Sequence, residues 1–448
     1  MKNFTVKDAA IACGAEIYGN CQGDRALGEV IIDSRLVKEG DMFVAYKGEK
    51  VDGHDFIPLA LEKGAACCLA QRVPEGTEGC VLAVEDVQSA LEKIAEAYRN
   101  CIDIPVVGIT GSVGKTTAKE MISAVLEQKF KVLKTDKNLN NHIGVPMTLS
   151  RIGAEHEAAV VEMGISGFGE MTVLAKMAKP DVAVFTYIGH AHLEFLHDLA
   201  GVFKAKTEML PYVAENGVVV VNGDDPYLNA VDCPQKVLRF GLGEHCDVRA
   251  ENISFGADGN IDCDIIYETR RISVHIPSYG QHMVYAALEG AAVGFAMGLD
   301  EAQIAAGIGQ YKTVGRRGAV TDTGYICLVD DCYNSNPDSL KCAIDSLVNL
   351  PGRHVCVLAD MLEQGENSPT IHREVGEYAR EKGIELLAAY GPMSKESCAA
   401  MGDKGIWFET KQQLMDAIPD LIRKGDAVLV KASLGMHLED VSELLKTL

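Results

Sequence analysis

The segment Thr110-Gly111-Ser112-Val113-Gly114-Lys115-Thr116-Thr117 is the most informative motif in the central part of this 448-residue chain. It follows the apolar run Val106–Ile109 and precedes a helical pattern through Leu126, so it connects a strand to a helix. Glycines in such a turn let backbone N–H groups surround a phosphate, and the helix N-terminus adds partial positive charge. The segment therefore predicts a mononucleotide-binding loop; the alternative is a structural strand-to-helix turn.

The side chains of this loop suit a nucleoside triphosphate and its metal ion. Lys115 is expected to reach the β- and γ-phosphates, and Thr116 offers a hydroxyl to Mg²⁺. The loop is shorter than the common G-x-x-x-x-G-K-[ST] pattern, because Ile109 stands where that pattern has its first glycine. The predicted nucleotide contacts are Gly111, Ser112, Val113, Gly114, Lys115, Thr116 and Thr117.

Strand and helix patterns alternate beyond the loop. Ala158–Glu162, Val182–Thr186 and Val218–Val221 are candidates for buried strands, with helical patterns between them. Alternation of this kind implies a mostly parallel sheet. The more polar stretch Val248–Ile276 alternates apolar and polar residues, which predicts antiparallel strands at the edge of the same domain.

The chain is expected to fold as three α/β domains, in keeping with about 150 residues per domain. Residues 1–102 form the first, which ends in the helical pattern Val87–Arg99. Residues 103–314 form the central domain, built on a P-loop-type mononucleotide-binding parallel sheet. Residues 315–448 form a Rossmann-like domain, because strand and helix patterns resume there. Its strand candidates are Ile326–Val329, Val355–Leu358, Leu386–Tyr390 and Val428–Val430.

Composition limits the kinds of partner. Acidic residues outnumber basic ones by 64 to 42, a net charge of -22, so binding to nucleic acid is not expected. No run of about 18 uncharged apolar residues is present, which argues against a membrane span. The N-terminal residues lack the apolar run of a signal peptide, so a cytoplasmic protein is expected. The 14 cysteines form no C-x-x-C pair and are expected to be reduced, structural thiols.

Two residues are candidates for a metal site near the loop. A hard cation prefers oxygen ligands, which neighbouring strand ends can supply. Glu162 ends the strand candidate Ala158–Glu162, and His192 follows the strand candidate that ends at Thr186. Taken alone, each residue is more often structural or solvated than a ligand.

Several segments, in order along the chain, resemble the Mur ligases, a family that also includes folylpolyglutamate synthetase. These segments are the loop Thr110–Thr117, Asn138-Leu139-Asn140-Asn141-His142-Ile143-Gly144-Val145-Pro146, Glu162-Met163-Gly164 and Ala191-His192-Leu193-Glu194. The resemblance implies that Asn138 and Asn141 lie near the ATP phosphates, although an Asn-rich turn is the alternative.

The same resemblance assigns the metal site. It implies that Glu162 and His192 are ligands of Mg²⁺ together with Thr116. It also implies that Lys206, in Lys204-Ala205-Lys206, is the lysine that CO₂ carbamylates to give a carboxylate-like ligand. Lys204 is the nearby alternative for that role.

The first and third domains extend the resemblance. Asp33-Ser34-Arg35 and Lys47-Gly48 resemble the UDP-binding domain of the family, which implies that Ser34, Arg35 and Lys47 bind the substrate; caps and turns are the alternative. Gly315-Arg316 resembles a family Gly-Arg that faces the ATP phosphates, and Arg317 leaves the register open. Asp330-Asp331-Cys332-Tyr333-Asn334-Ser335-Asn336-Pro337-Asp338-Ser339 resembles the family signature D-D-x-Y-N-A-N-P-x-S. It implies that ATP ribose binds Asp331 and that the acceptor side is shaped by Asn334, Asn336 and Ser339.

The activity that the resemblance implies is that of an ATP-dependent, ADP-forming peptide ligase in peptidoglycan synthesis, and hence in cell-wall biogenesis, cell shape and cell division. Such an enzyme joins D-alanyl-D-alanine to UDP-N-acetylmuramoyl-tripeptide through an acyl phosphate. ATP and Mg²⁺ are the implied cofactors, and a monomer is expected. The implied catalytic residues are Lys115, Lys206, His192 and Arg316.

Two other functions remain open from the sequence. The family ligase that adds the third amino acid shares the first-domain motifs but lacks Tyr-Asn-x-Asn-Pro. A nucleotide-dependent switch would need neither Lys206 nor the first domain. The sequence does not say whether the third residue of the tripeptide is lysine or diaminopimelate.

Four residues depart from the family pattern. Tyr187, Met283 and Ala286 stand where the family usually has asparagines. Leu434, in Lys431-Ala432-Ser433-Leu434, replaces an arginine, and a neutral leucine cannot pair with a carboxylate. We therefore expect missing polar contacts near the metal, near the adenine and near an anionic group of the substrate.

Overall fold

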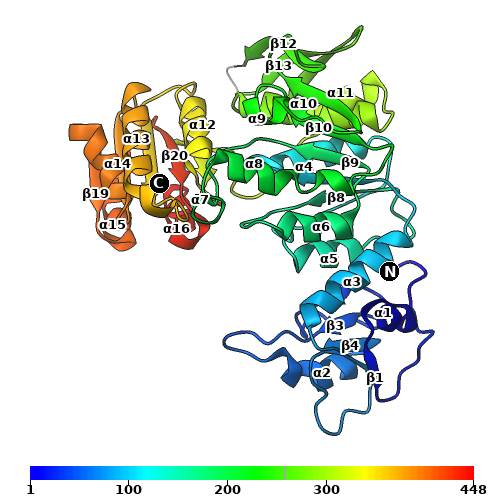
Figure 1. Cartoon of the computed structure of the whole chain (residues 1–448). Coiled ribbons are helices and arrows are strands. Elements are labelled where there is room, and N and C mark those ends of the chain that lie inside the picture. Colours follow the sequence, from blue (N-terminus) through cyan, green and yellow to red (C-terminus); the bar gives the residue numbers. More distant parts are fainter. Residues whose placement is uncertain (257–258) are drawn as a thin grey trace.

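The apolar runs of the chain form strands that assemble into three separate sheets, one in each domain (Figure 1). The computed structural model describes residues 1–256 and 259–448. The predicted α/β class with three domains is confirmed. The predicted divisions at 102/103 and 314/315 fall in loops between elements, and their exact positions remain predictions.

The first domain has a five-stranded sheet in the order β1-β5-β4-β3-β2. Its elements are α1 (Val6–Cys13), β1 (Glu16–Tyr18), β2 (Val30–Ile31), β3 (Met42–Val44), η1 (Gly53–Phe56), α2 (Ile57–Glu62), β4 (Cys67–Ala70), β5 (Val81–Ala83) and α3 (Val87–Asn100). The predicted helix Val87–Arg99 corresponds to α3. It starts where the Asp86 side chain accepts a hydrogen bond from Ser89 N, which satisfies one of the free N–H groups of its first turn.

The central domain has a nine-stranded sheet in the order β14-β13-β12-β11-β10-β9-β6-β8-β7. Strands β6 to β12 pair in parallel, and the pairs β12–β13 and β13–β14 are antiparallel, so the predicted antiparallel edge is confirmed. The strands are β6 (Val106–Thr110), β7 (Val132–Lys134), β8 (Ala158–Glu162), β9 (Val182–Phe185), β10 (Val218–Asn222), β11 (Lys236–Gly241), β12 (Val248–Phe255), β13 (Ile261–Tyr267) and β14 (Arg270–Ile276).

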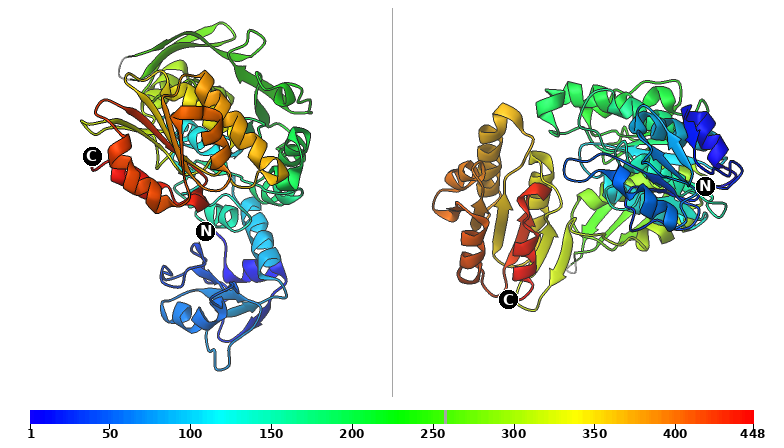
Figure 2. Two further views of the ribbon diagram at one scale, coloured as in Figure 1. Left: turned by 90° about the vertical axis from the view of Figure 1, so that its left-hand side faces the viewer. Right: turned by 90° about the horizontal axis from the view of Figure 1, so that it is seen from below.

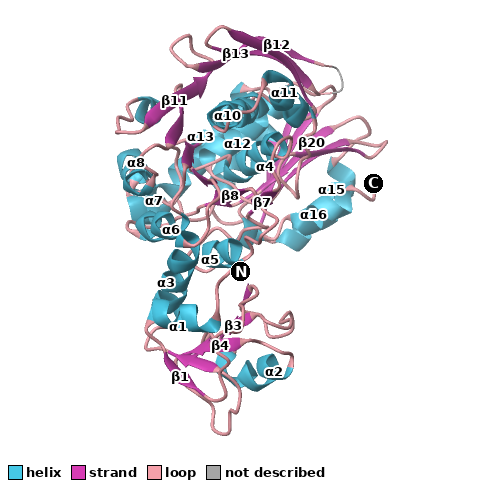
Figure 3. Ribbon diagram, turned by 90° about the vertical axis from the view of Figure 1, so that its right-hand side faces the viewer, coloured by secondary structure: helices cyan, strands magenta, loops and turns pink. Residues whose placement is uncertain are grey.

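Helices cover this sheet, and α10 and α11 lie beneath the curved β12–β13 edge (Figure 3). The α10 helix is apolar almost throughout, because it packs on α4 and on the strands of that half of the sheet. The helices are α4 (Lys115–Leu126), α5 (Gly144–Ser150), α6 (Glu170–Ala178), α7 (Leu193–Leu196), α8 (Leu199–Thr207), η2 (Leu210–Tyr212), α9 (Pro226–Asn229), α10 (His282–Ala296) and α11 (Glu301–Gly309).

The third domain has a six-stranded sheet in the order β15-β16-β20-β17-β18-β19, parallel except for β15. This arrangement confirms the predicted Rossmann-like domain. Its strands are β15 (Ala319–Asp322), β16 (Cys327–Asp331), β17 (His354–Ala359), β18 (Leu386–Tyr390), β19 (Gly405–Phe408) and β20 (Ala427–Lys431). Its helices are α12 (Pro337–Leu347), η3 (Gly365–Asn367), α13 (Ser368–Glu381), α14 (Ser394–Met401), η4 (Gly402–Lys404), α15 (Lys411–Leu421), η5 (Leu434–Met436) and α16 (Glu439–Leu445).

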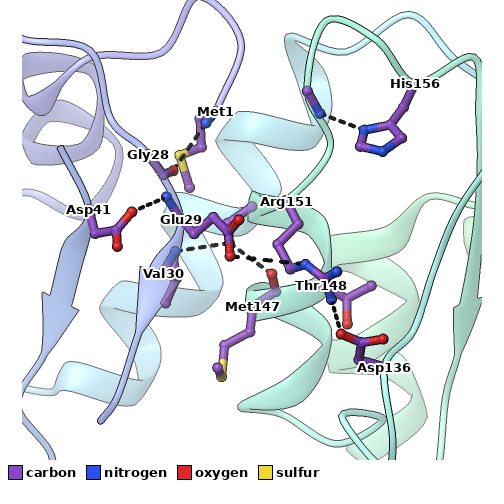
Figure 4. A network of polar contacts seen from close by, with 12 residues as sticks. Met1, Gly28, Glu29, Val30, Asp41, Asp136, Met147, Thr148, Arg151 and His156 are labelled. Carbon is purple, nitrogen blue, oxygen red and sulfur yellow. Dashed lines mark hydrogen bonds and ion pairs between the residues drawn. The ribbon is translucent and has the colours of Figure 1, made fainter. Parts of the chain in front are cut away.

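The first and central domains are joined by shared packing. One apolar cluster runs from Phe4, Tyr98 and other first-domain residues to Leu149 and Leu174 of the central domain. Polar contacts add to it: Ser150 Oγ accepts a hydrogen bond from Val30 N at 3.0 Å. Figure 4 shows the guanidinium of Arg151 reaching across this junction between Glu29 and Asp136.

The third domain is packed differently. Its apolar residues form two clusters that contain residues 326–445 alone. Figure 2 shows it as a separate body beside the central domain, whereas the first domain is joined to the central one through α3. The chain passes between the domains at residues 312–318, where Gly315 and Gly318 adopt left-handed φ values of 66° and 73°. These glycines allow the turns of the connection at little steric cost.

The cysteine prediction is wrong for one pair. Cys21 and Cys80 form a disulfide with a Cα–Cα distance of 4.5 Å, although 59 positions separate them in sequence. The bridge between Asn20 and Gly79 brings the two residues together, and no local pattern could reveal this. The other 12 cysteines are free, as expected. Among the described residues, no helix has the length and apolar character needed to cross a membrane.

Candidate active site

The loop Thr110–Thr117 joins β6 to α4, as predicted. A side chain at Gly111 would place its Cβ 1.9 Å from Thr186 Oγ1, so only glycine lets the loop pass this close to the end of β9. Gly114 is left-handed, with φ 84°, and α4 begins directly after it. The first N–H groups of α4 therefore point into the loop, where they can bind phosphate oxygens.

Lys115 lies at the first position of α4. Its Nζ donates a hydrogen bond to Gly111 O at 2.7 Å, which folds the ammonium group back over the loop. Burial lowers the pKa of Lys115, and the Glu162 carboxylate opposes this shift. The positive charge thus stands next to the phosphate position and next to the predicted metal ligand.

Glu162 is the best-defined acidic residue of the site. It ends β8 beside β6 and is only 1% exposed. Its two carboxylate oxygens accept hydrogen bonds from Thr116 Oγ1 at 2.8 Å and from Asn140 Nδ2 at 2.7 Å. Thr116 and Glu162 therefore present oxygen atoms to the same point, as a hard cation requires.

The asparagine segment contributes differently from the prediction. Asn140, and neither Asn138 nor Asn141, donates a hydrogen bond to Glu162. Asn141 instead accepts hydrogen bonds from Ile143 N and Gly144 N, so it supports the start of α5. Asn138 is exposed, and the described residues give its side chain no hydrogen bond. The alternation Asn138, Asn140, Asn141 left the choice of residue open to an error of register.

His192 follows β9 and precedes α7, in a left-handed conformation with φ 55°. Its Nδ1 lies 2.6 Å from an oxygen of Glu363 in the third domain. Burial lowers the pKa of His192, and the Glu363 charge opposes that shift. A neutral imidazole is the form that binds a metal ion.

Lys206 lies on α8 and is 1% exposed, whereas Lys204 is exposed and lies over the Phe168 ring. Within residues 1–256 and 259–448, the Lys206 amine has neither a hydrogen bond nor an ion pair. Burial lowers the pKa of Lys206 well below its usual value, and the charge of Lys115 adds to the effect. Of the two lysines that the sequence left as alternatives, only Lys206 is buried.

Two adjacent arginines of the third domain, Arg316 and Arg317, are candidates for the residue that faces the phosphates. Arg316 donates to Glu439 O and to a Glu443 carboxylate oxygen, so its guanidinium is held against α16. Arg317 instead lies over the Tyr333 ring at 3.7 Å, and its charge acts on the pKa of Lys115. These contacts favour Arg317 as the residue that faces the phosphate loop.

Asp331 ends β16 and accepts a hydrogen bond from Lys431 Nζ at 2.5 Å. Its charge also acts on His282, at the start of α10, whose pKa is lowered mainly by burial. The predicted ribose ligand therefore lies at the junction between the central and third domains.

The predicted acceptor residues have local roles as well. Asn336 caps α12: its Oδ1 accepts from Ser339 N at 2.8 Å, and Ser339 Oγ donates back to Asn336 O. Asn334 is exposed and accepts from Ser335 N. Among the described residues, the side-chain amide nitrogens of Asn334 and Asn336 make no hydrogen bond, and Asn334 is the more exposed of the two.

The predicted UDP-binding residues lie on loops of the first domain. Ser34 is 7% exposed, and Arg35 is exposed and paired with Asp33 at 2.7 Å. Lys47 is exposed and follows β3 on a different loop. In the described part of the chain no hydrogen bond or ion pair joins the side chains of these residues, and their assignment remains a prediction.

The four departures lie in three places. Tyr187 O accepts from Ser112 N, so its backbone supports the phosphate loop. Met283 and Ala286 are buried in the core under the central sheet. Leu434 is 49% exposed at the start of η5.

Three family models match the chain. Mur ligase middle domain matches residues 109–294, and Mur ligase, glutamate ligase domain matches residues 315–434. Mur ligase family, catalytic domain matches residues 27–107.

Individual relatives match over almost the whole chain. UDP-N-acetylmuramoyl-tripeptide–D-alanyl-D-alanine ligase of Bacillus subtilis is 36% identical over 426 residues, with 92% of each chain covered. The crystal structure of MurF from Acinetobacter baumannii matches with a TM-score of 0.92 and 28% identity, covering 99% of both chains. MurF ligase from Thermotoga maritima in complex with ADP matches with a TM-score of 0.84 and 30% identity, covering 95% of this chain and 99% of that one.

Proposed function

This chain belongs to the Mur ligase family, and we propose that it joins D-alanyl-D-alanine to UDP-N-acetylmuramoyl-tripeptide with ATP as the energy source. The observation that carries the proposal is the match along nearly the full length of ligases named for this reaction. A match limited to the central domain, which carries the phosphate loop, would support only nucleotide binding. The reaction belongs to peptidoglycan precursor synthesis, and we propose that the enzyme acts in the cytoplasm.

The geometry suits the two steps of such a reaction. The tripeptide carboxylate attacks the γ-phosphorus of ATP, ADP leaves, and an acyl phosphate forms. The amine of the dipeptide then attacks the acyl carbon, an amide bond forms, and inorganic phosphate leaves with the release of a proton. Lys115 and the N-terminus of α4 stabilise the negative charge of the transferring phosphoryl group.

The residues around Glu162 fit Mg²⁺. Glu162 is a buried carboxylate that faces a threonine hydroxyl, and His192 and Lys206 lie on neighbouring segments. Mg²⁺ bound there would neutralise phosphate charge. We propose Thr116, Glu162, His192 and carbamylated Lys206 as the residues that hold it.

Carbamylation of Lys206 follows from its environment. A neutral amine is nucleophilic, and burial favours the neutral form of Lys206. The amine nitrogen attacks the carbon of CO₂, an N–C bond forms, and one proton leaves, which gives a carbamate anion. The product is an oxygen ligand where the unmodified side chain would be an unpaired buried cation.

Arg317, and not Arg316, is the arginine that we assign to the phosphates. We expect Arg317→Ala to lower kcat roughly a hundredfold, because it removes a charge that acts on the transferring group. Arg316→Ala is expected to reduce the thermal stability of the third domain, through the loss of the contacts to α16, with a smaller effect on kcat. Phosphate release and thermal melting of both variants check this, and a larger loss of kcat in Arg316→Ala would return the assignment to Arg316.

Amine selectivity tests the proposed function. Neutral amides such as Asn334 offer hydrogen bonds to a peptide backbone, and each group that the bound substrate covers but leaves unpaired costs about 1–3 kcal/mol. We therefore expect kcat/KM for D-alanyl-D-alanine to exceed that for D-alanine, lysine or diaminopimelate by roughly a hundredfold or more. The measurement is phosphate release with each amine at saturating ATP and UDP-tripeptide.

The same assay separates the alternatives. A preference for a free diamino acid with UDP-dipeptide would move the assignment to the ligase that adds the third residue. ADP release that needs neither the UDP-peptide nor an amine would indicate a nucleotide-dependent switch. Leu434 is expected to affect only the affinity for the dipeptide. A high KM for the dipeptide with unchanged selectivity would be consistent with the absence of an arginine at this position.

A further inference from the structure

The loop between β9 and His192 is held by side chains from three different parts of the molecule. Three consecutive backbone N–H groups, at residues 188–190, each donate to a side-chain oxygen. Ile188 N donates to Asp225 Oδ2 at 2.7 Å, and Gly189 N donates to Ser112 Oγ at 2.9 Å. His190 N donates to Asp338 Oδ2 at 2.6 Å. We call residues 187–190 the sensor loop.

Two of these three partners belong to the central domain. Asp225 follows β10, and Ser112 is part of the phosphate loop. The third, Asp338, lies in the first turn of α12 in the third domain. The sensor loop is therefore complete only when the third domain lies against the central one.

The sensor loop also contacts the groups that handle the phosphate. Ser112 Oγ donates to Gly189 O at 3.0 Å, and Ser112 N donates to Tyr187 O at 2.8 Å. His192 follows two residues after the loop. A shift of the loop would therefore move both the phosphate loop and His192.

The third domain has few other attachments. Among the described residues, its hydrogen bonds and ion pairs with the central domain are those of Asp338 with His190 and of Glu363 with His192. It shares no apolar cluster with the rest of the described chain. A cavity of about 320 Å³, lined by Phe255, Tyr279 and Leu350 among others, lies between the domains. A junction of this kind gains little from apolar burial, so single polar contacts have a large share in its stability.

We propose that Asp338 is a positioning residue that couples docking of the third domain to the order of the phosphate loop and of His192. Its carboxylate accepts the hydrogen bond of His190 N only in the docked arrangement. Docking thus completes the sensor loop, and phosphoryl transfer proceeds efficiently only when the domain that contributes Asn334 is in place. The proposal rests on the proposed ligase function.

The side chain at position 338 can be varied to separate geometry from charge. Asp338→Asn keeps an oxygen at the same distance from the backbone and removes the charge. Asp338→Glu keeps the charge and the favourable acidic residue in the first turn of a helix, but lengthens the side chain. Asp338→Ala removes both. His190→Ala removes the imidazole, which lies 3.1 Å from the same carboxylate, and keeps the backbone N–H.

Steady-state ligase assays give the first readout. We expect kcat to fall roughly tenfold to a hundredfold in Asp338→Ala and Asp338→Glu, because a hydrogen bond to a charged acceptor is lost or distorted. The KM for the UDP-tripeptide should stay near that of the wild type. Asp338→Asn and His190→Ala should each keep kcat within a few-fold of the wild type. Asp345→Asn is the matched control, since Asp345 lies on the same helix and contacts Tyr378 and Lys382 of its own domain.

Small-angle X-ray scattering gives a second readout that does not depend on turnover. With ADP and UDP-tripeptide bound, we expect Asp338→Ala to have a larger radius of gyration than the wild type, and Asp345→Asn to match the wild type. Thermal melting of each variant identifies any that fail to fold; Asp338→Glu retains the first-turn acid and serves in place of Asp338→Ala.

The outcomes are distinct from those that test the ligase assignment, because the wild type is assayed for D-alanyl-D-alanine ligation first. Normal kcat and normal scattering in Asp338→Glu would overturn the proposal. A loss in Asp338→Asn equal to that in Asp338→Ala would also overturn it, because the charge and not the hydrogen bond to the backbone would then matter. An equal loss in His190→Ala would assign the effect to the imidazole and likewise contradict the proposal.

Discussion

Replacing Lys115 with alanine is expected to lower kcat by roughly a hundredfold to a thousandfold, the range seen when one preorganised charge-stabilising group is removed. Lys115 begins α4 and folds over the loop toward Gly111 O. It contributes little to apolar packing, because its ammonium group donates a hydrogen bond to the backbone of the loop and is attracted by the Glu162 carboxylate. Phosphate release measures turnover, and circular dichroism checks the fold.

Lys129 provides the control for this experiment. It lies just beyond the C-terminal end of α4 and donates to Gly298 O, far from the phosphate loop. Lys129→Ala should keep turnover near the wild-type value. A folded Lys115→Ala variant with near-normal turnover would exclude the loop as the ATP site.

Lys206→Ala is expected to reduce activity about a hundredfold or more, since loss of a metal ligand should exceed the 10–100-fold cost of losing a ligand's hydrogen-bond partner. Alanine also removes a buried, unpaired amine, so the variant should not be less stable than the unmodified protein. A small carboxylate added to the assay should restore part of the activity, because it can occupy the place of the carbamate.

Lys204→Ala is the matched control, two positions away on the same helix. Lys204 is exposed, and its charge lies over the Phe168 ring, so its removal should change activity only slightly. Depletion of CO₂ should lower the activity of the wild type and leave the residual activity of Lys206→Ala unchanged. If Lys204→Ala is the inactive variant instead, the carbamylated residue is Lys204 and our assignment to Lys206 is wrong.

The strands at the centres of the sheets were predictable because they are buried on both faces. The sequence predicts Ala158–Glu162 and Leu386–Tyr390, and these are the bounds of β8 and β18. For β16 the prediction ends at Val329, whereas the strand continues to Asp331. The last two residues of β16, Asp330 and Asp331, pair with β20, but their polar side chains interrupt the apolar run that predicts the strand.

Edge strands were not predictable in the same way. In β15 the residues after Ala319 are exposed, and in β19 every residue is only partly buried. Strand β15 has no apolar run, and the run in β19 is only three residues long, Ile406 to Phe408. Their place in the sheet depends on pairing with β16 and β18, which is a property of the fold and not of the segment.

Some residues of the site were likewise predictable from the sequence, and others were not. Glu162 and Lys206 could be selected because each stands in a motif that resembles the family. Asn140 was missed because three asparagines in one turn differ only in register, and the structure alone shows which of them reaches Glu162. Asp338 gave no signal, since its partner is the backbone of a loop in another domain.

The apolar cluster that runs from the first domain into the central one has a consequence for how the protein loses its structure. Separation of α3 from α5 and α6 would expose Tyr98, Leu149 and Leu174 to water at once. The two domains therefore form one cooperative unit of unfolding, while the third domain, with clusters of its own, can melt independently. A chain cut before Gly315 would keep its stabilising contacts, and a chain cut at the end of α3 would lose them.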